Sequence, residues 1–184
     1  MIEEPHNDIR VVFAEDCPET IKIFKEVIHR LSWRGLYVEN AVEIMDVVNN
    51  LLTEGLTLDA VVADISFISG PKVTGITAVR EIRKAMPNVP VIFISAYVTS
   101  IIREEVRRVG AEIMQKPFNV PDLFVRLSQL ISWYRLAMSK EYEGEDKRRA
   151  SVNRSANFRR ATDYVLSTPD RIAETLKDLD KVKE

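Results

Sequence analysis

The chain has 184 residues, of which 46% are hydrophobic and 29% are charged. This length suits one globular domain with an appendage, and the single cysteine, Cys17, excludes an internal disulfide framework. The formal net charge of −2 does not demand a nucleic-acid or membrane partner, and no amino-terminal apolar stretch resembles a signal peptide or a spanning helix. We therefore expect a soluble, cytoplasmic protein with no membrane partner.

Short runs rich in β-branched residues alternate with longer segments in which apolar residues recur every three to four positions. This alternation is typical of βα units around a parallel sheet and predicts a doubly wound α/β domain with three layers. The first, third and fourth runs are almost wholly apolar, as expected of central strands, and the other two are expected at the edges. In chain order, the predicted strands are residues 9–14, 37–41, 60–65, 91–95 and 112–115, and the predicted helices are residues 18–32, 42–54, 75–86, 100–109 and 121–138.

The last part of the chain differs in character from the βα series. Residues 140–151 contain a glycine and few apolar side chains, so we expect a linker or a frayed helix extension. Thr168 and Pro169 then open a second helical pattern with a narrow apolar stripe. The stripe consists of Ile172, Leu176 and Leu179. We therefore divide the chain into a domain of residues 1–140 and a helical C-terminal extension of residues 141–184.

Polar side chains gather where the predicted strands end. In an open parallel sheet, ligands bind beyond the carboxyl ends of the strands. Three acids at that edge would repel one another unless a cation joined them, and all-oxygen ligation suits Mg²⁺. An Asp held in this way can act as a nucleophile towards a phosphoryl group. The residues at this edge are Glu15 and Asp16 after the first strand, Asp64 at the end of the third, Ser95 at the end of the fourth and Lys116 after the fifth.

The ordered motifs resemble the CheY-like receiver domain of two-component response regulators over about residues 8–139. The resemblance lies in "VVFAEDCPET", "DAVVADI", "VPVIFISAY" and "GAEIMQKPF". It implies a flavodoxin-like five-stranded sheet of order 2-1-3-4-5 with helices on both faces. It also implies that Asp64 accepts phosphate from a sensor histidine kinase or phosphotransfer protein. By the same resemblance, Glu15, Asp16, Asp64 and the backbone carbonyl of Ser66 bind Mg²⁺, Ser95 contacts the phosphate and Lys116 neutralises it.

A protein of this kind catalyses only its own phosphotransfer and a slow autodephosphorylation, so we do not expect an enzyme. The sequence departs from the family pattern at two places. Gly75 lies eleven residues beyond Asp64, which lengthens the loop beside the site, and Ile113 stands three positions before Lys116, where the family usually has Tyr or Phe. Whether the hydroxyl of Ser95 is coupled to a neighbouring side chain, as it is to an aromatic ring in the family, is therefore an open question. A receiver-like module that binds partners without phosphorylation stays as an alternative.

Other functions find less support in the sequence. Neither the glycine-rich P-loop motif of nucleoside triphosphatases nor the glycine-rich dinucleotide-binding motif follows the first strand. A phosphoryl hydrolase of one large class would need Asp at position 66, where this chain has Ser66. The basic stretch of residues 147–160 could bind nucleic acid, but Phe158 is its only aromatic residue, and acids balance bases over residues 141–184. We instead expect the extension to bind a downstream protein or to mediate self-association, with nucleic acid as the second choice.

Overall fold

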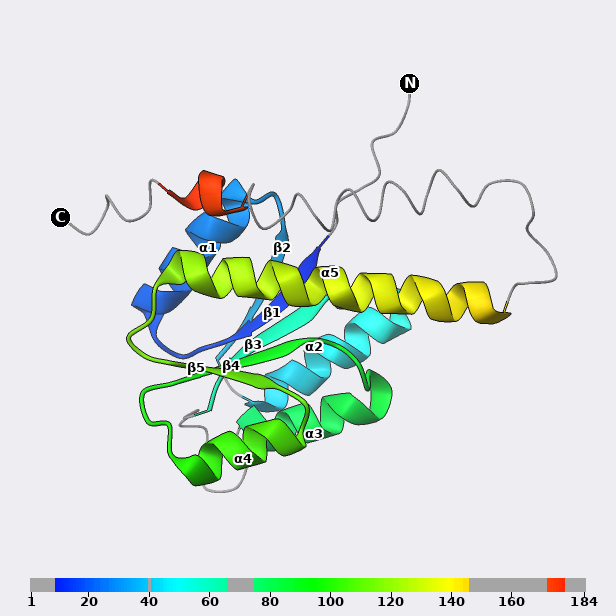
Figure 1. The fold of residues 1–184 in the computed structure, drawn as a ribbon, viewed down its shortest axis with the longest axis horizontal. Coiled ribbons are helices and arrows are strands. Elements are labelled where there is room, and N and C mark those ends of the chain that lie inside the picture. The colour runs from blue at the N-terminus through cyan, green and yellow to red at the C-terminus, as the bar shows by residue number, and fades with distance from the viewer. Residues whose placement is uncertain (1–8, 40, 66–74, 146–171, 178–184) are drawn as a thin grey trace. The chain divides into compact units, whose positions relative to one another are not determined.

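A computed structural model describes residues 9–39, 41–65, 75–145 and 172–177 of this chain (Figure 1). The chain forms two compact units, Met1–Phe118 and Asn119–Glu184. No helix in the described ranges is both long enough and apolar enough to cross a membrane.

Five strands form one sheet in the first unit, and all neighbouring pairs run parallel (Figure 1). The strand order is β2-β1-β3-β4-β5, as predicted. Every residue of β3 and β4 is buried, whereas β2 and β5 at the edges are largely half-buried. The strands are β1 (Arg10–Ala14), β2 (Arg34–Val38), β3 (Ala60–Asp64), β4 (Val91–Ser95) and β5 (Glu112–Gln115).

Helices cover both faces of the sheet in the first unit. Successive side chains of a strand point to opposite faces. On one face, Phe13 of β1 meets Phe24 of α1, with ring centroids 5.0 Å apart. On the other face, alternate residues of β1, β3 and β4 share one hydrophobic core with side chains from α2, α3 and α4. The helices are α1 (Pro18–Arg30), α2 (Ala41–Thr53), α3 (Gly75–Ala85) and α4 (Ser100–Arg108).

The second strand lies three residues earlier than the sequence pattern predicts, so the prediction of residues 37–41 was wrong. Its start follows directly from the end of α1. Ser32 adopts a positive φ of 54°, and after the buried Trp33 the backbone N–H of Arg34 donates to the carbonyl of Ile9 at 2.8 Å. This turn begins the β1–β2 pairing at Arg34 and leaves Ala41 to begin α2.

The second unit contains α5 (Val120–Glu145) and a short helical segment at residues 172–176. The apolar side chains Leu123, Phe124, Leu127 and Ile131 of α5 are buried. The helix crosses position 140 without a break, so residues 141–145 form the helix extension that was one of the two expectations. In the short segment, Ile172 and Leu176 of the predicted stripe are also buried. Residues 146–151, Thr168, Pro169 and Leu179 lie outside the described residues.

Candidate functional site

Four of the polar residues singled out in the sequence lie along one edge of the sheet. Glu15 directly follows β1, Asp64 ends β3 and Ser95 ends β4, while Lys116 directly follows β5. These strands are neighbours in the order β1-β3-β4-β5 and run parallel, so their carboxyl ends meet at the same edge. The topology therefore assembles the residues from positions far apart in the chain.

Lys116 joins two carboxylates at this edge. Its Nζ donates to Glu15 Oε2 at 2.6 Å and to Asp64 Oδ2 at 2.7 Å. The side chains of Glu15 and Asp64 are only 1% and 10% exposed. Two like charges removed from water in this way are costly unless a cation offsets them, and the ammonium group of Lys116 does so.

The ionisation of Lys116 follows from these contacts. Burial of the ammonium group acts to lower the pKa of Lys116, but the hydrogen bonds to Asp64 and Glu15, together with their negative charges, raise it by more. The net result is a pKa above the ordinary value for lysine. Lys116 is therefore a fixed positive charge beside Asp64 at neutral pH.

The adjacent acids after β1 have different environments. Glu15 is fully buried, its backbone N–H donates to the carbonyl of Val38 at 3.1 Å, and its Oε1 accepts from the backbone N–H of Cys17 at 3.2 Å. Asp16 is exposed. Glu15 is therefore held inside the site by the backbone and by Lys116, whereas the carboxylate of Asp16 is open to water and to solute ions.

Ser95 is buried, and its hydroxyl forms a closed ring with the backbone of Tyr97. The Oγ atom donates to the carbonyl of Tyr97 at 3.0 Å and accepts from the N–H of the same residue at 3.2 Å. The carbonyl of Ser95 also accepts from the backbone N–H of Lys116 at 2.8 Å, ahead of the cis peptide bond between Lys116 and Pro117. Ser95 thus connects the β4–α4 loop with the segment that carries the lysine.

Gly75 is a site residue whose role sequence reasoning missed. It is the first residue of α3, and a methyl group on its Cα would lie 2.6 Å from the backbone carbonyl oxygen of Asp64. Only a residue without a side chain allows α3 to begin this close to Asp64. The signal available in the sequence is a glycine at the start of a helical pattern, and it does not reveal which backbone group it approaches.

Ile113, at the position where the family usually has an aromatic ring, contributes to the core. It is paired with Phe93 across β4 and β5, and its partly buried side chain packs against the core that α2, α3 and α4 share. An aliphatic chain in this position fills space beside the sheet. Ser66 and Lys72, which the sequence places in the loop after Asp64, lie outside the described residues.

The side chains at this edge can be compared with the needs of a divalent cation. Within the described residues, no group of three or more His, Cys, Asp and Glu side chains surrounds a common point where a metal ion could sit. Glu15 and Asp64 converge on the ammonium group of Lys116 instead. Their convergence shows that one cation can reach both carboxylates, and Asp16 follows Glu15 in the chain. The donor set is all oxygen and fits Mg²⁺ by its chemistry.

Comparisons with known proteins agree with this architecture. The family model for the response regulator receiver domain matches residues 11–128. The chain is 26% identical over 137 residues to YrkP, an uncharacterized transcriptional regulatory protein of Bacillus subtilis. The aligned region is 74% of this chain and 55% of YrkP, so the chain spans about half the length of that relative.

Solved structures of receiver domains have the same fold. The CheY-like receiver domain protein of Methanospirillum hungatei matches with a TM-score of 0.63 at 16% identity, over 71% of this chain and 98% of that one. The non-phosphorylated HemR receiver domain of Leptospira biflexa matches with a TM-score of 0.56 at 24% identity, over 68% and 95%. The receiver domain of the sensor histidine kinase PA1611 of Pseudomonas aeruginosa, which holds a magnesium ion in its active-site cleft, matches with a TM-score of 0.55 at 24% identity, over 67% and 98%. With the CheY-like sheet order and the family match over most of its length, the chain belongs to the response regulator receiver domain family.

Proposed function

We propose that this protein is a response regulator that accepts a phosphoryl group on Asp64 and thereby switches protein–protein interactions in a phosphorelay. The donor is a sensor histidine kinase or a phosphotransfer protein, and the reaction takes place in the cytoplasm. The observation that carries the proposal is the hydrogen bond of 2.7 Å from the Lys116 ammonium group to Asp64, at the carboxyl edge of the sheet. An acid held beside a fixed cation is suited to phosphoryl transfer.

In this proposal Asp64 is the nucleophile. Its carboxylate oxygen forms the new P–O bond as the bond from phosphorus to the donor nitrogen breaks, so the phosphoryl group passes from phosphohistidine to the aspartate. Lys116 then offsets negative charge on the transferred oxygens, which is the main contribution a protein makes to this reaction. Glu15 keeps the ammonium group in place through its own bond of 2.6 Å.

The proposal includes a requirement for Mg²⁺. Glu15, Asp16, Asp64 and the backbone carbonyl of Ser66 would hold the ion. Bound there, Mg²⁺ would offset charge on the phosphoryl oxygens and orient them towards Asp64. The support is the oxygen donor set at this edge and the magnesium-bound receiver domain of PA1611, which shares the fold.

The signal would leave the site through Ser95. A hydroxyl that turns towards a phosphate on Asp64 must give up its ring of hydrogen bonds with Tyr97, and the β4–α4 loop would be released from that ring. Tyr97 is 77% exposed, so a change in this loop alters the surface that a downstream protein meets. This step does not require the aromatic side chain that Ile113 replaces.

The first prediction tests phosphorylation directly. Full-length protein treated with acetyl phosphate and Mg²⁺ should gain one phosphoryl group, because the donor needs only the nucleophile, the lysine and the ion. The Asp64→Asn variant should gain none, since an amide cannot form the acyl phosphate. Intact-mass spectrometry reads the added mass, and a chelator should abolish labelling of the wild type.

Asp46→Asn is the matched control, because Asp46 is an exposed acid on α2 and its loss should leave labelling intact. Labelling that survives in Asp64→Asn would refute the assignment of the acceptor. A folded wild type that takes no label from acetyl phosphate or from a phosphorylated histidine phosphotransfer domain would instead support the module that acts without phosphorylation.

A further inference from the structure

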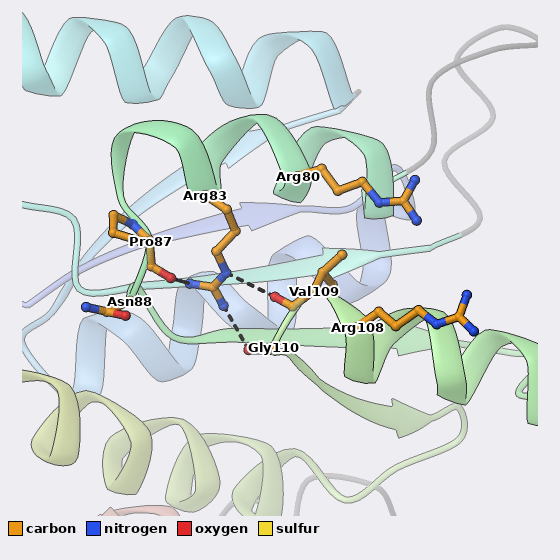
Figure 2. A pocket seen from close by; sticks show the side chains of 7 residues that line it. All are labelled: Arg80, Arg83, Pro87, Asn88, Arg108, Val109 and Gly110. Carbon is orange, nitrogen blue, oxygen red and sulfur yellow. Dashed lines mark hydrogen bonds between the residues drawn. The ribbon is translucent and has the colours of Figure 1, made fainter.

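A groove lies near the amino ends of the strands, whereas Asp64 and Lys116 lie at the carboxyl ends. It is lined by side chains of α3 and of the end of α4 and by the loops that precede β4 and β5, so it lies near the amino ends of these strands (Figure 2). Its volume is about 610 Å³. Three arginines, the amide of Asn88 and the loop residues around Pro87 and Gly110 line it, and no acid is among the lining residues in the part of the chain that the structure describes. The groove is therefore a basic surface separate from the phosphorylation site.

Arg83 forms the floor of the groove and is used structurally. Its guanidinium donates to the carbonyls of Pro87 and Gly110, each at 2.9 Å, and to that of Val109 at 3.1 Å (Figure 2). It also donates to the carbonyl of Val89. These bonds tie the loop before β4 to the loop before β5. The donors of Arg83 are directed to the protein backbone, but its positive charge remains under the groove.

Arg80 and Arg108 are free to bind a ligand in a way that Arg83 is not. They extend from α3 and α4 and are 51% and 67% exposed (Figure 2). Arg80 forms a long ion pair with Glu105, at 3.6 Å. Arg108 shares Glu104 with Arg107 and uses only its Nε, at 3.3 Å. Ion pairs between exposed groups are weak, so a multiply charged anion can compete with the glutamates.

The size of the groove decides between two kinds of ligand. A stable protein–protein interface uses about 20–30 residues on each side, whereas small-molecule sites have volumes of about 300–1,000 Å³. The seven lining residues among those that the structure describes and the volume of about 610 Å³ fit the second kind. The planar guanidinium matches the geometry of phosphate oxygens, which it can bind with two parallel hydrogen bonds. We propose that the groove between α3 and α4 binds a small anion that carries phosphate groups, through Arg80 and Arg108.

The test is isothermal titration of the full chain with inorganic pyrophosphate, in chelator and at low ionic strength, so that no metal ion takes part. The wild type should bind, and Arg80→Gln combined with Arg108→Gln should weaken binding about tenfold or more. The matched Lys variants keep the charge but lose the planar fork, so they should bind with intermediate affinity. Tighter binding of ADP than of pyrophosphate would identify a nucleotide rather than a free phosphate as the source of the anion.

Arg107→Gln is the control, because Arg107 is exposed on α4 beside Arg108 and is not a lining residue of the groove. It should leave the affinity for pyrophosphate within about twofold of the wild type. Unaltered binding in the double Gln variant, with its thermal unfolding midpoint unchanged, would overturn the proposal. Binding lost only in Lys116→Met would place the anion at the other edge, and an oligoglutamate peptide that binds in preference to pyrophosphate would assign the groove to a protein partner.

Discussion

Lys116 is the residue on which the electrostatics of the site depend. It contacts a carboxylate from β3 and another from the end of β1, and both are removed from water. Burial of these two carboxylates carries a large desolvation cost, which the positive charge between them offsets. The same lysine therefore has a structural role in the unphosphorylated protein and, in our proposal, a chemical role during phosphoryl transfer.

We predict that Lys116→Met lowers the free energy of unfolding by about 2 kcal/mol at neutral pH, because it removes the cation between two buried carboxylates; the lysine is partly exposed, so the effect is below that of a fully buried pair. The folded-state pKa of Lys116 is raised. Its contribution is therefore fully present below the ordinary lysine pKa of about 10.4 and is lost as pH rises through the raised value. Urea denaturation at several pH values measures the difference between wild type and variant.

Lys84→Met is the control for this comparison. Lys84 is 72% exposed and pairs with Glu81 on the same helix, so its removal should change stability by less than about 0.5 kcal/mol. Added Mg²⁺ should restore stability to Lys116→Met more than it stabilises the wild type, since the ion would supply the missing charge. Equal stability losses in the two variants would contradict the structural role of Lys116.

The sequence predicts which residues reach the site better than it predicts their contacts. The ends of successive parallel strands meet at one edge, so Glu15, Asp64, Ser95 and Lys116 could be placed there from the strand pattern alone. The partners of each side chain depend on rotamers and on residues as many as 101 positions away, as for Lys116 and Glu15. Ser95 forms its ring of hydrogen bonds with a residue only two positions away. Even so, no pattern in the sequence distinguishes a serine bonded in this way from an exposed one.

At the scale of elements, β2 shows where pattern reading fails. The sequence of this strand, RGLYV, contains an arginine and a glycine, so its first half does not look like a strand. The glycine is explained by Tyr37, whose ring stacks on Phe13 with centroids 5.4 Å apart. A Cβ at Gly35 would lie 2.4 Å from the hydroxyl of Tyr37. Gly35 therefore leaves room for the Tyr37 ring two residues along the same strand, and that ring is placed by its stack on Phe13 of β1, a tertiary contact that the local sequence does not reveal.

The two loops before β4 and β5 depend on Arg83, and we predict that Arg83→Met lowers the free energy of unfolding by about 2 kcal/mol. Hydrogen bonds to a charged group are worth about 1.5–3 kcal/mol each, but the groove is open, so water can replace part of what the four carbonyls lose. Urea denaturation gives the stability. Hydrogen exchange should show faster exchange at the amino ends of β4 and β5 than in the wild type.

Arg80→Met provides the comparison for Arg83, because it removes an arginine three residues earlier on α3 whose ion pair spans 3.6 Å between exposed groups. It should change stability by less than about 0.5 kcal/mol. If both variants lost the same stability, the effect would come from the charge of α3 and not from the bonds that hold the loops.

At the scale of the whole molecule, the division between the two compact units falls after Phe118, whereas composition places the domain boundary after residue 140. The composition changes within α5, a continuous helix of 26 residues, so the change marks no break in the chain. The division at residue 140 therefore remains a prediction. On α5, Trp133 and Met138 are large apolar side chains that are 66% and 44% exposed, so part of this helix is not covered by apolar packing within the described chain.

The extension beyond α5 gives the last prediction. Ile172 and Leu176 are 3% and 0% exposed in a single chain, so the protein itself covers them. An isolated segment this short is marginal in water, and its helix depends on that cover. Leu176→Asp should detach the helical segment of residues 172–176 from the side chains that cover it, because a buried unpaired charge is costly. Limited proteolysis would detect this as faster cleavage and light scattering as altered association, with Asp64 still phosphorylated. Ala173→Asp adds the same charge at an exposed position of the same turn and should leave both properties unchanged. Identical behaviour of the two variants would contradict the packing of residues 172–176 against the rest of the protein. Salt-sensitive binding of DNA or RNA by the full chain would then favour the nucleic-acid alternative.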